Sequence, residues 1–379
     1  MKKASLLSVT ALIAFFLISA NSVEAKIWRV NNGSNYNGTT LWGSNFGGSP
    51  AYPVFKQIDQ AIAWSSVMDS DTIHVESSQF IYTAATITKK VVLIGPGFFL
   101  PDNSKTGNNL LDARVTRINF NAGSEGSSVM GLNISVNTNT ADGYIQIAAD
   151  NITIKRCRIE RSIYFHISGG SGIQRITIVQ NYFPDSYVTN ALYFTNSNFV
   201  PPVEVIFNNN ICQKTLLWER SATGLAWNVT QCRNNVFDGP DNLATPNLRF
   251  TTSDFSNNIL MPVNAIVDIT ATPAQIAYNI GTQAAQFGTS NNNVVVPDIT
   301  TLFIGGESKD GFYQVKSGSQ AYQNGSDGSD RGAFGGAIPS TRYTLSGLAP
   351  IPVIYEAVSA GSVSAETGLP VTIKARTIK

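Results

Sequence analysis

One short pattern recurs about every two dozen residues between Leu132 and Asn279, and asparagine stands repeatedly at its central position. In the most regular units, apolar residues lie five and three positions before the centre and two positions after it. The successive centres are Leu132, Cys157, Asn181, Asn210, Asn235, Asn258 and, in a weaker frame, Asn279. A fixed period with β-type alternation inside each unit is typical of a solenoid, in which every turn buries its apolar face against its neighbours. The pattern therefore predicts a stack of coiled strands.

The composition agrees with strands and narrows the choice of partners. Charged residues make up 13% of the 379 residues, against roughly 25% in an ordinary soluble domain. Low charge together with 31 glycines and many Asn, Ser and Thr favours strands and tight turns over helices. A net charge of +1 creates no field that would attract nucleic acid or an anionic membrane, so neither is an expected partner.

Residues 1–25 have the features of a secretory signal. Lys2 and Lys3 form a basic start, residues 6–18 form an apolar run, and residues 23–25 supply a cleavage site that ends in a small residue. The apolar run is shorter than the ~20 residues that span a bilayer. We therefore expect an exported protein, extracellular, on the cell surface or in the periplasm, with no membrane span once the signal is removed.

The three cysteines occupy different positions of the repeat. Cys157 lies at the centre of its unit, Cys212 two positions after a centre, and Cys232 three positions before one. This spacing resembles no zinc site and aligns no pair for a disulfide. It predicts buried, reduced thiols that fill space as small apolar groups.

The chain outside the repeat suggests a cover at each end. Phe55, Ile58, Ala61 and Ile62 recur at helical spacing, which predicts an amphipathic helix over the open first coil. Residues 353–355 and 371–374 are expected to form two short strands that cover the C-terminal end. The predicted divisions are residues 1–25 (signal), 26–70 (strand, loop and capping helix), 71–338 (β-helix) and 339–379 (C-terminal β extension).

The chain resembles secreted bacterial members of the pectin-lyase-like superfamily, which are single-stranded right-handed parallel β-helices. The resemblance covers roughly residues 50–338 and depends on the helix that leads into residues 71–75, on the asparagine repeat, and on the Gly-Ala-Phe-Gly-Gly ending at residues 332–336. It implies an all-β fold with three strands per coil and a turn at the central asparagine. It also implies that Asn181, Asn210, Asn235 and Asn258 are structural, each amide bonding to its copies above and below. The residues before them, Asn208, Asn209, Asn234 and Asn257, are expected to serve the turn backbone.

The first strand of each coil carries the candidate chemistry, because enzymes of the resembling superfamily place their catalytic cleft on this sheet. Alternation leaves one outward residue per coil in our prediction, stacked in one column about 4.8 Å apart. These residues are Gln146, His166, Tyr193, Glu219, Arg249 and Asp268. We expect catalytic roles for His166, Glu219, Arg249 and Asp268, and substrate-binding roles for Gln146, Tyr193 and Tyr187. His166 or Tyr193 could move a proton and Arg249 could neutralise a substrate carboxylate.

The sequence allows two alternatives both for the inward residues near Leu216 and for the location of an insertion. Leu216 and Trp218 are taken as inward-facing, but Leu217 and Glu219 could face inward instead. The long step from Asn181 to Asn210 implies about five extra loop residues, which either residues 184–187 or residues 196–202 could hold. Insertions in solenoids tend to border a binding face, and Tyr187 could stack there on a sugar ring.

The sequence thus supports two functional hypotheses that share one partner, a polysaccharide or cell-surface glycan. The first is a lyase or hydrolase that uses the outward column, and the second is a noncatalytic adhesion or glycan-binding solenoid. The paired-Asp pattern of polygalacturonases and the Arg-x-Pro-x-x-Arg segment of calcium-dependent pectate lyases are both missing. No cofactor and no metal site is predicted, and the protein is expected to be a monomer.

Overall fold

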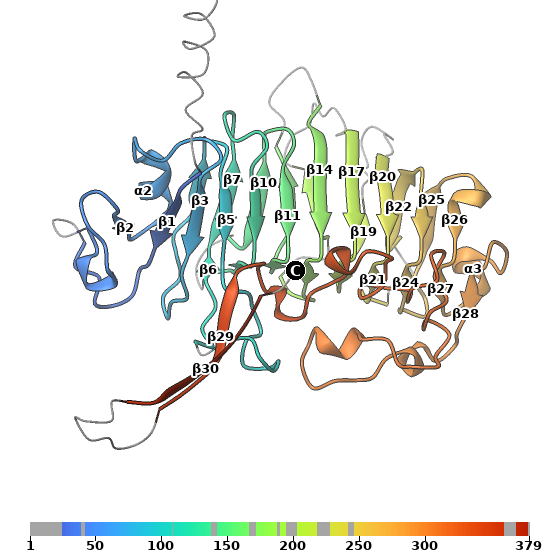
Figure 1. The fold of residues 1–379 in the computed structure, drawn as a ribbon. Helices are drawn as coiled ribbons and strands as arrows, with labels where there is room; N and C mark the ends of the chain where they lie inside the picture. The colour runs from blue at the N-terminus through green and yellow to red at the C-terminus, as the bar shows by residue number, and fades with distance from the viewer. Residues whose placement is uncertain are drawn as a thin grey trace, which may run out of the picture.

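The computed structural model describes residues 25–38, 42–107, 109–137, 142–166, 172–187, 190–194, 203–217, 228–241, 246–359 and 369–377. Within these residues the chain forms three parallel sheets whose strands follow one another in interleaved order (Figure 1). Successive strands of one sheet come from successive coils, which is the arrangement of a parallel β-helix, as predicted. The predicted signal segment, apart from Ala25, lies outside the described residues.

Each coil contributes one short strand to each sheet in its regular part. The first sheet contains β4 (Ala85–Ile87), β7 (Arg117–Phe120), β10 (Tyr144–Ile147), β13 (Ile163–Phe165) and β16 (Leu192–Phe194). The second contains β1 (Ile27–Val30), β2 (Val54–Phe55), β3 (Thr72–Val75), β5 (Val92–Ile94), β8 (Ser128–Met130), β11 (Thr153–Lys155), β14 (Gln174–Val179), β17 (Val203–Asn208), β20 (Asn228–Arg233), β23 (Phe255–Ser256) and β26 (Ile276–Ala277), and is joined by β19 (Leu216–Leu217), β22 (Leu248–Thr252) and β25 (Val267–Thr270). The third contains β6 (Arg114–Val115), β9 (Asn133–Ile134), β12 (Arg158–Ile159), β15 (Tyr182–Phe183), β18 (Ile211–Cys212), β21 (Val236–Phe237), β24 (Ile259–Leu260), β27 (Ile280–Gly281) and β28 (Val294–Val295).

The apolar positions of the repeat stack in register through the core. Residues three positions before each centre pair from coil to coil, in the order Ile154, Ile178, Phe207, Cys232, Phe255 and Ile276. Aromatic rings add a stack inside the coil: Phe183, Phe207, Phe237 and Phe255 follow one another with centroids 5.9–6.3 Å apart. The three cysteines are buried and free, as predicted, and burial raises the pKa of each thiol.

The asparagine ladder is continuous and buried. From Asn210 onward, the side-chain oxygen of each Asn accepts both the backbone N–H and the side-chain amide of the Asn one coil earlier, at 2.8–3.2 Å. The oxygen of Asn181 accepts the Cys157 N–H at 3.0 Å. Each side-chain amide also donates to a backbone carbonyl of the preceding coil, for example Asn235 Nδ2 to Phe207 O of β17 at 2.8 Å. The members are Asn181, Asn210, Asn235, Asn258, Asn279 and one residue not predicted, Asn293. Asn293 was missed because the last coil shortens the step to 14 residues.

The residue before each central residue makes the turn. Gly131, Arg156, Gln180, Asn209, Asn234, Asn257 and Tyr278 all have φ between 53° and 69°, a left-handed region that Gly and Asn adopt most readily. The predicted turn role of Asn209, Asn234 and Asn257 is therefore confirmed. Asn208 instead ends β17, where its side-chain oxygen accepts the Arg233 N–H at 2.8 Å.

Short helices cover the two ends of the stack. At the N-terminal end, α2 (Ile58–Ala63) packs Ile58, Ala61 and Ile62 into the core, as the sequence predicts. At the other end, α3 (Ala284–Phe287) follows β27 and places Phe287 on Phe255, with ring centroids 5.4 Å apart.

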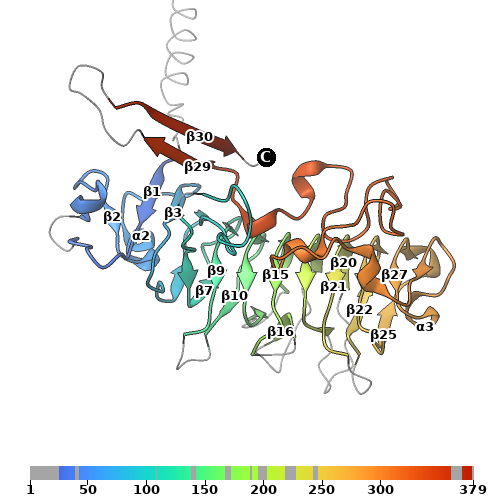
Figure 2. The same cartoon turned by 90° about the horizontal axis from the view of Figure 1, so that it is seen from below.

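The expected location of the C-terminal strands is wrong. β29 (Pro352–Ser359) and β30 (Val371–Thr377) form an antiparallel hairpin that lies beside the N-terminal coils (Figures 1 and 2). The reason is the preceding stretch, residues 296–349, here called the return segment. It runs back along the third sheet from the C-terminal end, so the hairpin begins near the opposite end (Figure 2).

The return segment buries the outward face of the third sheet. Tyr182, Ile211, Val236, Ile259 and Ile280 face it and form a second apolar cluster with residues such as Leu302 and Tyr313. Polar side chains at the turns hold it in place. The amide of Gln180 donates to the carbonyls of Ser340 and Arg342, and the amide of Asn209 donates to those of Ala333 and Gly335.

We predict that Asn235→Ala destabilises the fold by about 3 kcal/mol or more. The substitution removes the acceptor of Asn210 and the donor to Phe207 O and Asn258 Oδ1, and each buried group left without a partner costs about 1–3 kcal/mol. Urea unfolding measures the change. The matched control is Asn324→Ala, whose exposed amide makes one hydrogen bond at 3.2 Å and which should change stability by no more than about 0.5 kcal/mol. Equal effects of the two substitutions would contradict a structural role for the ladder.

Candidate functional site

The outward face of the first sheet carries one column of paired residues. Register places Thr86, Asn119, Gln146, Tyr164 and Tyr193 at the same position of β4, β7, β10, β13 and β16. Their strand neighbours, such as Ile145 and Phe165, are buried. The column therefore contains Gln146 and Tyr193, and Tyr164 stands between them.

His166 lies beside this column and not in it. Ile147 pairs with Phe165, so His166 is level with Ala148, one pair farther along the strand. Its backbone N–H donates to Ile147 O at 2.8 Å. Alternation alone leaves both Tyr164 and His166 facing outward, and only the pairing of β10 with β13 identifies Tyr164 as the column member.

Arg249 and Asp268 form a separate pair. They are in register on β22 and β25, and Arg249 Nε donates to Asp268 Oδ2 at 2.9 Å. Arg249 pairs on its other side with Leu217 of β19. An isolated bridge joins Asn190 to Thr215, which sets Leu217 level with Leu192 and not with Tyr193. The predicted six-residue column is therefore not continuous, because Arg249 and Asp268 are out of register with Tyr193.

Leu216 is buried, as predicted, whereas Glu219 and Trp218 lie outside the described residues. The described part of the chain therefore places Gln146 with Tyr193, and Arg249 with Asp268. It places His166 next to the first group.

Three tyrosine rings pack against one another across neighbouring coils on this face. The ring centroids of Tyr144 and Tyr164 are 4.5 Å apart, and those of Tyr164 and Tyr193 are 5.3 Å apart with an interplanar angle of 67°. On the neighbouring strand β7, Arg117 Nη1 donates to Tyr144 Oη at 3.0 Å. Burial raises the pKa of Tyr164, so its phenol stays protonated and can donate a hydrogen bond at neutral pH.

A pocket of about 610 Å³ opens next to these tyrosine rings and is called here the tyrosine pocket. It lies within the size range of small-ligand sites, roughly 300–1,000 Å³. Its lining residues come from the first sheet and from the loop that precedes β16. They are Ser162, Tyr164, Asp185, Ser186, Tyr187, Asn190 and Tyr193.

The loop over the pocket holds the extra residues of the long coil. Nine positions separate Phe183 from Leu192, against four from Ile159 to Ile163 one coil earlier. The spacing from Phe194 to Val205 equals that from Phe165 to Ile176, so the coil has no extra residues there. The insertion therefore lies at residues 184–190, the first of the two predicted locations. It brings Tyr187, which is 66% exposed, to the pocket that contains Tyr193.

Two hydrogen bonds hold the backbone and side chain of Ser186 in this loop. Ser186 Oγ donates to Glu160 O at 2.9 Å, and the Lys214 ammonium donates to Ser186 O. Lys214 is only 2% exposed, and burial lowers the pKa of its ammonium to about 8, although Cys212, Asp185 and Glu160 act in the opposite direction.

A series of side-chain hydrogen bonds, called here the polar chain, connects the base of this loop to the return segment. Tyr182 Oη donates to Gln213 Oε1 at 2.8 Å, Gln213 Nε2 to Tyr313 Oη at 2.9 Å, and Tyr313 Oη to Asp238 Oδ2 at 2.6 Å. These hydrogen bonds could not be predicted from local pattern, because Tyr313 is 75 residues from Asp238. It fixes the base of the loop to the core of the molecule.

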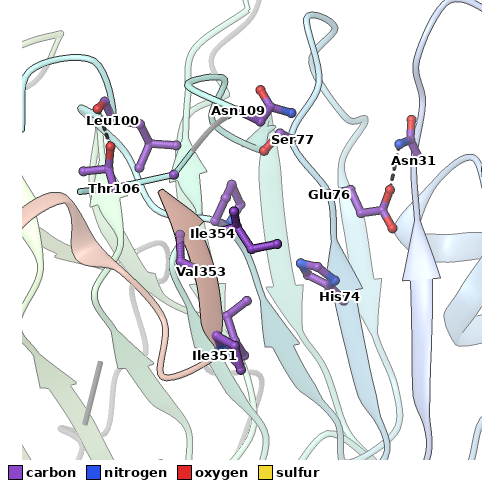
Figure 3. Close-up of a pocket in the computed structure, with 13 residues that line it drawn as sticks. Asn31, His74, Glu76, Ser77, Leu100, Thr106, Asn109, Ile351, Val353 and Ile354 are labelled. Atoms are coloured by element: carbon purple, nitrogen blue, oxygen red, sulfur yellow. Dashed lines mark hydrogen bonds between the residues drawn. The ribbon is translucent and has the colours of Figure 1, made fainter. Parts of the chain in front are cut away.

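A second pocket, of about 360 Å³, lies between the C-terminal hairpin and the second sheet (Figure 3). His74, Glu76 and Asn31 form one wall, and Ile351, Val353 and Ile354 of the hairpin region form another. Glu76 is already engaged, since Asn31 Nδ2 donates to it at 2.8 Å and Arg29 pairs with it. The ring of His74 faces the hairpin in Figure 3. This pocket is where the hairpin contacts the coils.

The described residues contain no group of three or more His, Cys, Asp or Glu that could hold a metal ion. Among the same residues, no helix has the length and apolar character needed to cross a bilayer.

We predict that His74 makes the folded state sensitive to mild acid. Burial lowers its pKa from the ordinary 6.5, Glu76 opposes this effect and Arg29 adds to it. Above about pH 6.5 the ring is neutral whether the chain is folded or unfolded. As the pH falls below 6.5 the unfolded chain binds the proton more readily, so folding loses stability. Urea midpoints at about pH 7.5 and about pH 5.5 should therefore differ more for the wild type than for His74→Gln.

The same measurement on His166→Gln shows whether any effect belongs to the His74 position or to loss of a histidine in general. Equal acid sensitivity of the wild type and His74→Gln would contradict the prediction.

Comparison with models of known protein families, with curated proteins and with solved structures finds no match for this chain. The functional inference therefore depends on the fold and on the geometry of the residues described above.

Proposed function

We propose that this chain is an exported β-helix protein that binds polysaccharide on the outward face of its first sheet, with the tyrosine pocket as the binding site. The observation that carries the proposal is the meeting of Tyr164 and Tyr193 from the sheet with Tyr187 from the inserted loop around one pocket. Tyrosine combines a large rigid apolar face with a polar tip, which suits a ligand with both C–H faces and hydroxyl groups.

The polar residues of the pocket support the same ligand class. Asp185 contributes an exposed carboxylate to the lining, and beneath it Ser162 Oγ donates to Asn190 O at 2.5 Å and Thr215 Oγ1 donates to Asn190 Oδ1 at 2.6 Å. Gln146 and Asn119 continue the tyrosine column with amide side chains. A row of hydrogen-bonding groups that follows the coils suits an extended chain of repeating units better than a single small molecule.

Membership of the pectin-lyase-like superfamily is part of the proposal. Its support is the parallel coil with a buried asparagine ladder and the covering helix α2. Export is proposed from residues 1–25, whose basic start and apolar run match a secretory signal.

A catalytic function is the second candidate, with His166, Glu219, Arg249 and Asp268 as the reacting groups. The observation in its favour is that Arg249 and Asp268 lie side by side on the outward face, with the Asp268 side chain 57% exposed. The two hypotheses differ in products. An enzyme releases unsaturated products or new reducing ends from a polysaccharide, whereas a binding protein retains the polysaccharide unchanged.

We predict that Tyr193→Ala weakens polysaccharide binding about tenfold, because the substitution removes one aromatic wall of the pocket. Affinity electrophoresis in gels that contain acidic or neutral polysaccharides measures retention, and the same polysaccharides are assayed for unsaturated products and reducing ends. The matched control is Tyr52→Ala, which removes a tyrosine that is 69% exposed and outside the pocket. Retention that is unaffected by Tyr193→Ala would overturn the assignment of the site. Turnover that Arg249→Ala abolishes would favour the enzyme.

A further inference from the structure

The tyrosine pocket has one charged residue among the seven that line it. That residue is Asp185, which is exposed on the inserted loop and lies two positions before Tyr187. Its backbone N–H donates to Gln213 Oε1 at 3.3 Å, so the loop backbone at this point is tied to the polar chain beneath it. Asp185 thus lines the pocket together with the three tyrosines.

The aromatic walls favour positive charge as well. The face of an aromatic ring carries negative potential and attracts an ammonium group within about 6 Å of its centre. Tyr164 and Tyr193 meet at 67°, and Tyr187 adds a third ring to the lining. Three phenol rings and a carboxylate form the kind of surface that binds an ammonium group.

Two cations of the protein, Lys214 and Arg161, lie near this pocket without lining it. The Lys214 ammonium lies under the loop, where it donates to Ser186 O, and its side chain does not line the pocket. The Arg161 charge opposes the effect of burial on the pKa of Tyr164, but Arg161 is not among the lining residues. Among the other acids, Glu160 pairs with Arg158, and Asp238 accepts the Tyr313 hydroxyl. Asp185, whose charge also acts on the Lys214 ammonium, is the charged residue in the lining of the pocket.

On the basis of the proposed function, we infer that the tyrosine pocket selects an amino sugar with a free ammonium group, so that the preferred ligand is a deacetylated amino-sugar polysaccharide. The ammonium contacts Asp185 and the tyrosine rings. A uronic acid in the same position would bring its carboxylate against Asp185, which disfavours acidic polysaccharides at this site.

The test compares a glucosamine hexamer with its N-acetylated counterpart. The two differ only at the amino group, which is a free ammonium in the first and a neutral acetamide in the second. Calorimetry at low salt and mildly acidic pH, where the amine is protonated, measures both affinities for the full chain. The wild type should prefer the amine about tenfold, from an exposed ion pair and cation–π contacts together. Asp185→Asn should remove most of this preference and leave the affinity for the N-acetylated hexamer within about twofold. Asp102→Asn, which changes an exposed aspartate outside the pocket, is the matched control and should retain the preference.

The outcomes separate this inference from the proposed function. Equal affinity of the wild type for the two hexamers, or a preference that Asp185→Asn leaves intact, would overturn the selection of an amine. Binding of neither hexamer, with another polysaccharide still retained in gels through Tyr193, would overturn the ligand class and leave the proposed site in place. Binding of either hexamer that Tyr193→Ala does not weaken would overturn the site itself.

Discussion

The hydrogen bonds between stacked asparagines set the geometry on which the rest of the molecule depends. Each ladder amide satisfies a backbone N–H and a carbonyl of its neighbours inside a core that excludes water, where an unpaired polar group would cost about 1–3 kcal/mol. A coil can therefore be longer or shorter, but it must return to the same position at this turn. The steps of 29 and 14 residues show that the chain accommodates the change elsewhere. In the long coil the extra residues are placed in the loop before β16, and this loop becomes one wall of the tyrosine pocket.

Local pattern was enough to predict the coiled stack, the ladder, the inward apolar positions and helix α2, because each follows from the alternation or spacing of neighbouring residues. The outward column required information that alternation lacks. Tyr164 and His166 both face outward on one strand, and their column is decided by the strand one coil earlier. Ala191 and Leu192 are adjacent and both buried, so the alternation breaks there and the column is interrupted before Arg249. The location of the hairpin was unpredictable for a related reason, since it depends on where the distant return segment ends.

One pattern in the sequence indicates the cover over the third sheet. The residue directly after the ladder asparagine is apolar in five successive coils, as Tyr182, Ile211, Val236, Ile259 and Ile280. On a solvent-facing strand this position would be polar, because alternation places it outward. Its apolar character therefore implied a covering layer, which the return segment supplies. With that face buried, the third sheet over these coils is closed to a large ligand, and the first sheet is the face that combines outward aromatic residues with an open pocket.

The tyrosine pocket joins two kinds of support that a binding site needs. Tyr164 and Tyr193 are positioned by strand pairing in a sheet whose register the ladder maintains, so their spacing cannot change without disturbing the core. Tyr187 and Asp185 belong to a loop, but Ser186 between them is bonded to Glu160 O and to the buried Lys214 ammonium. Burying that ammonium is unfavourable, as the lowered pKa of Lys214 shows, and the contact with the Ser186 carbonyl compensates only while the loop stays in place. The loop backbone is therefore held in place beside the sheet before any ligand arrives, which reduces the ordering that binding would otherwise require.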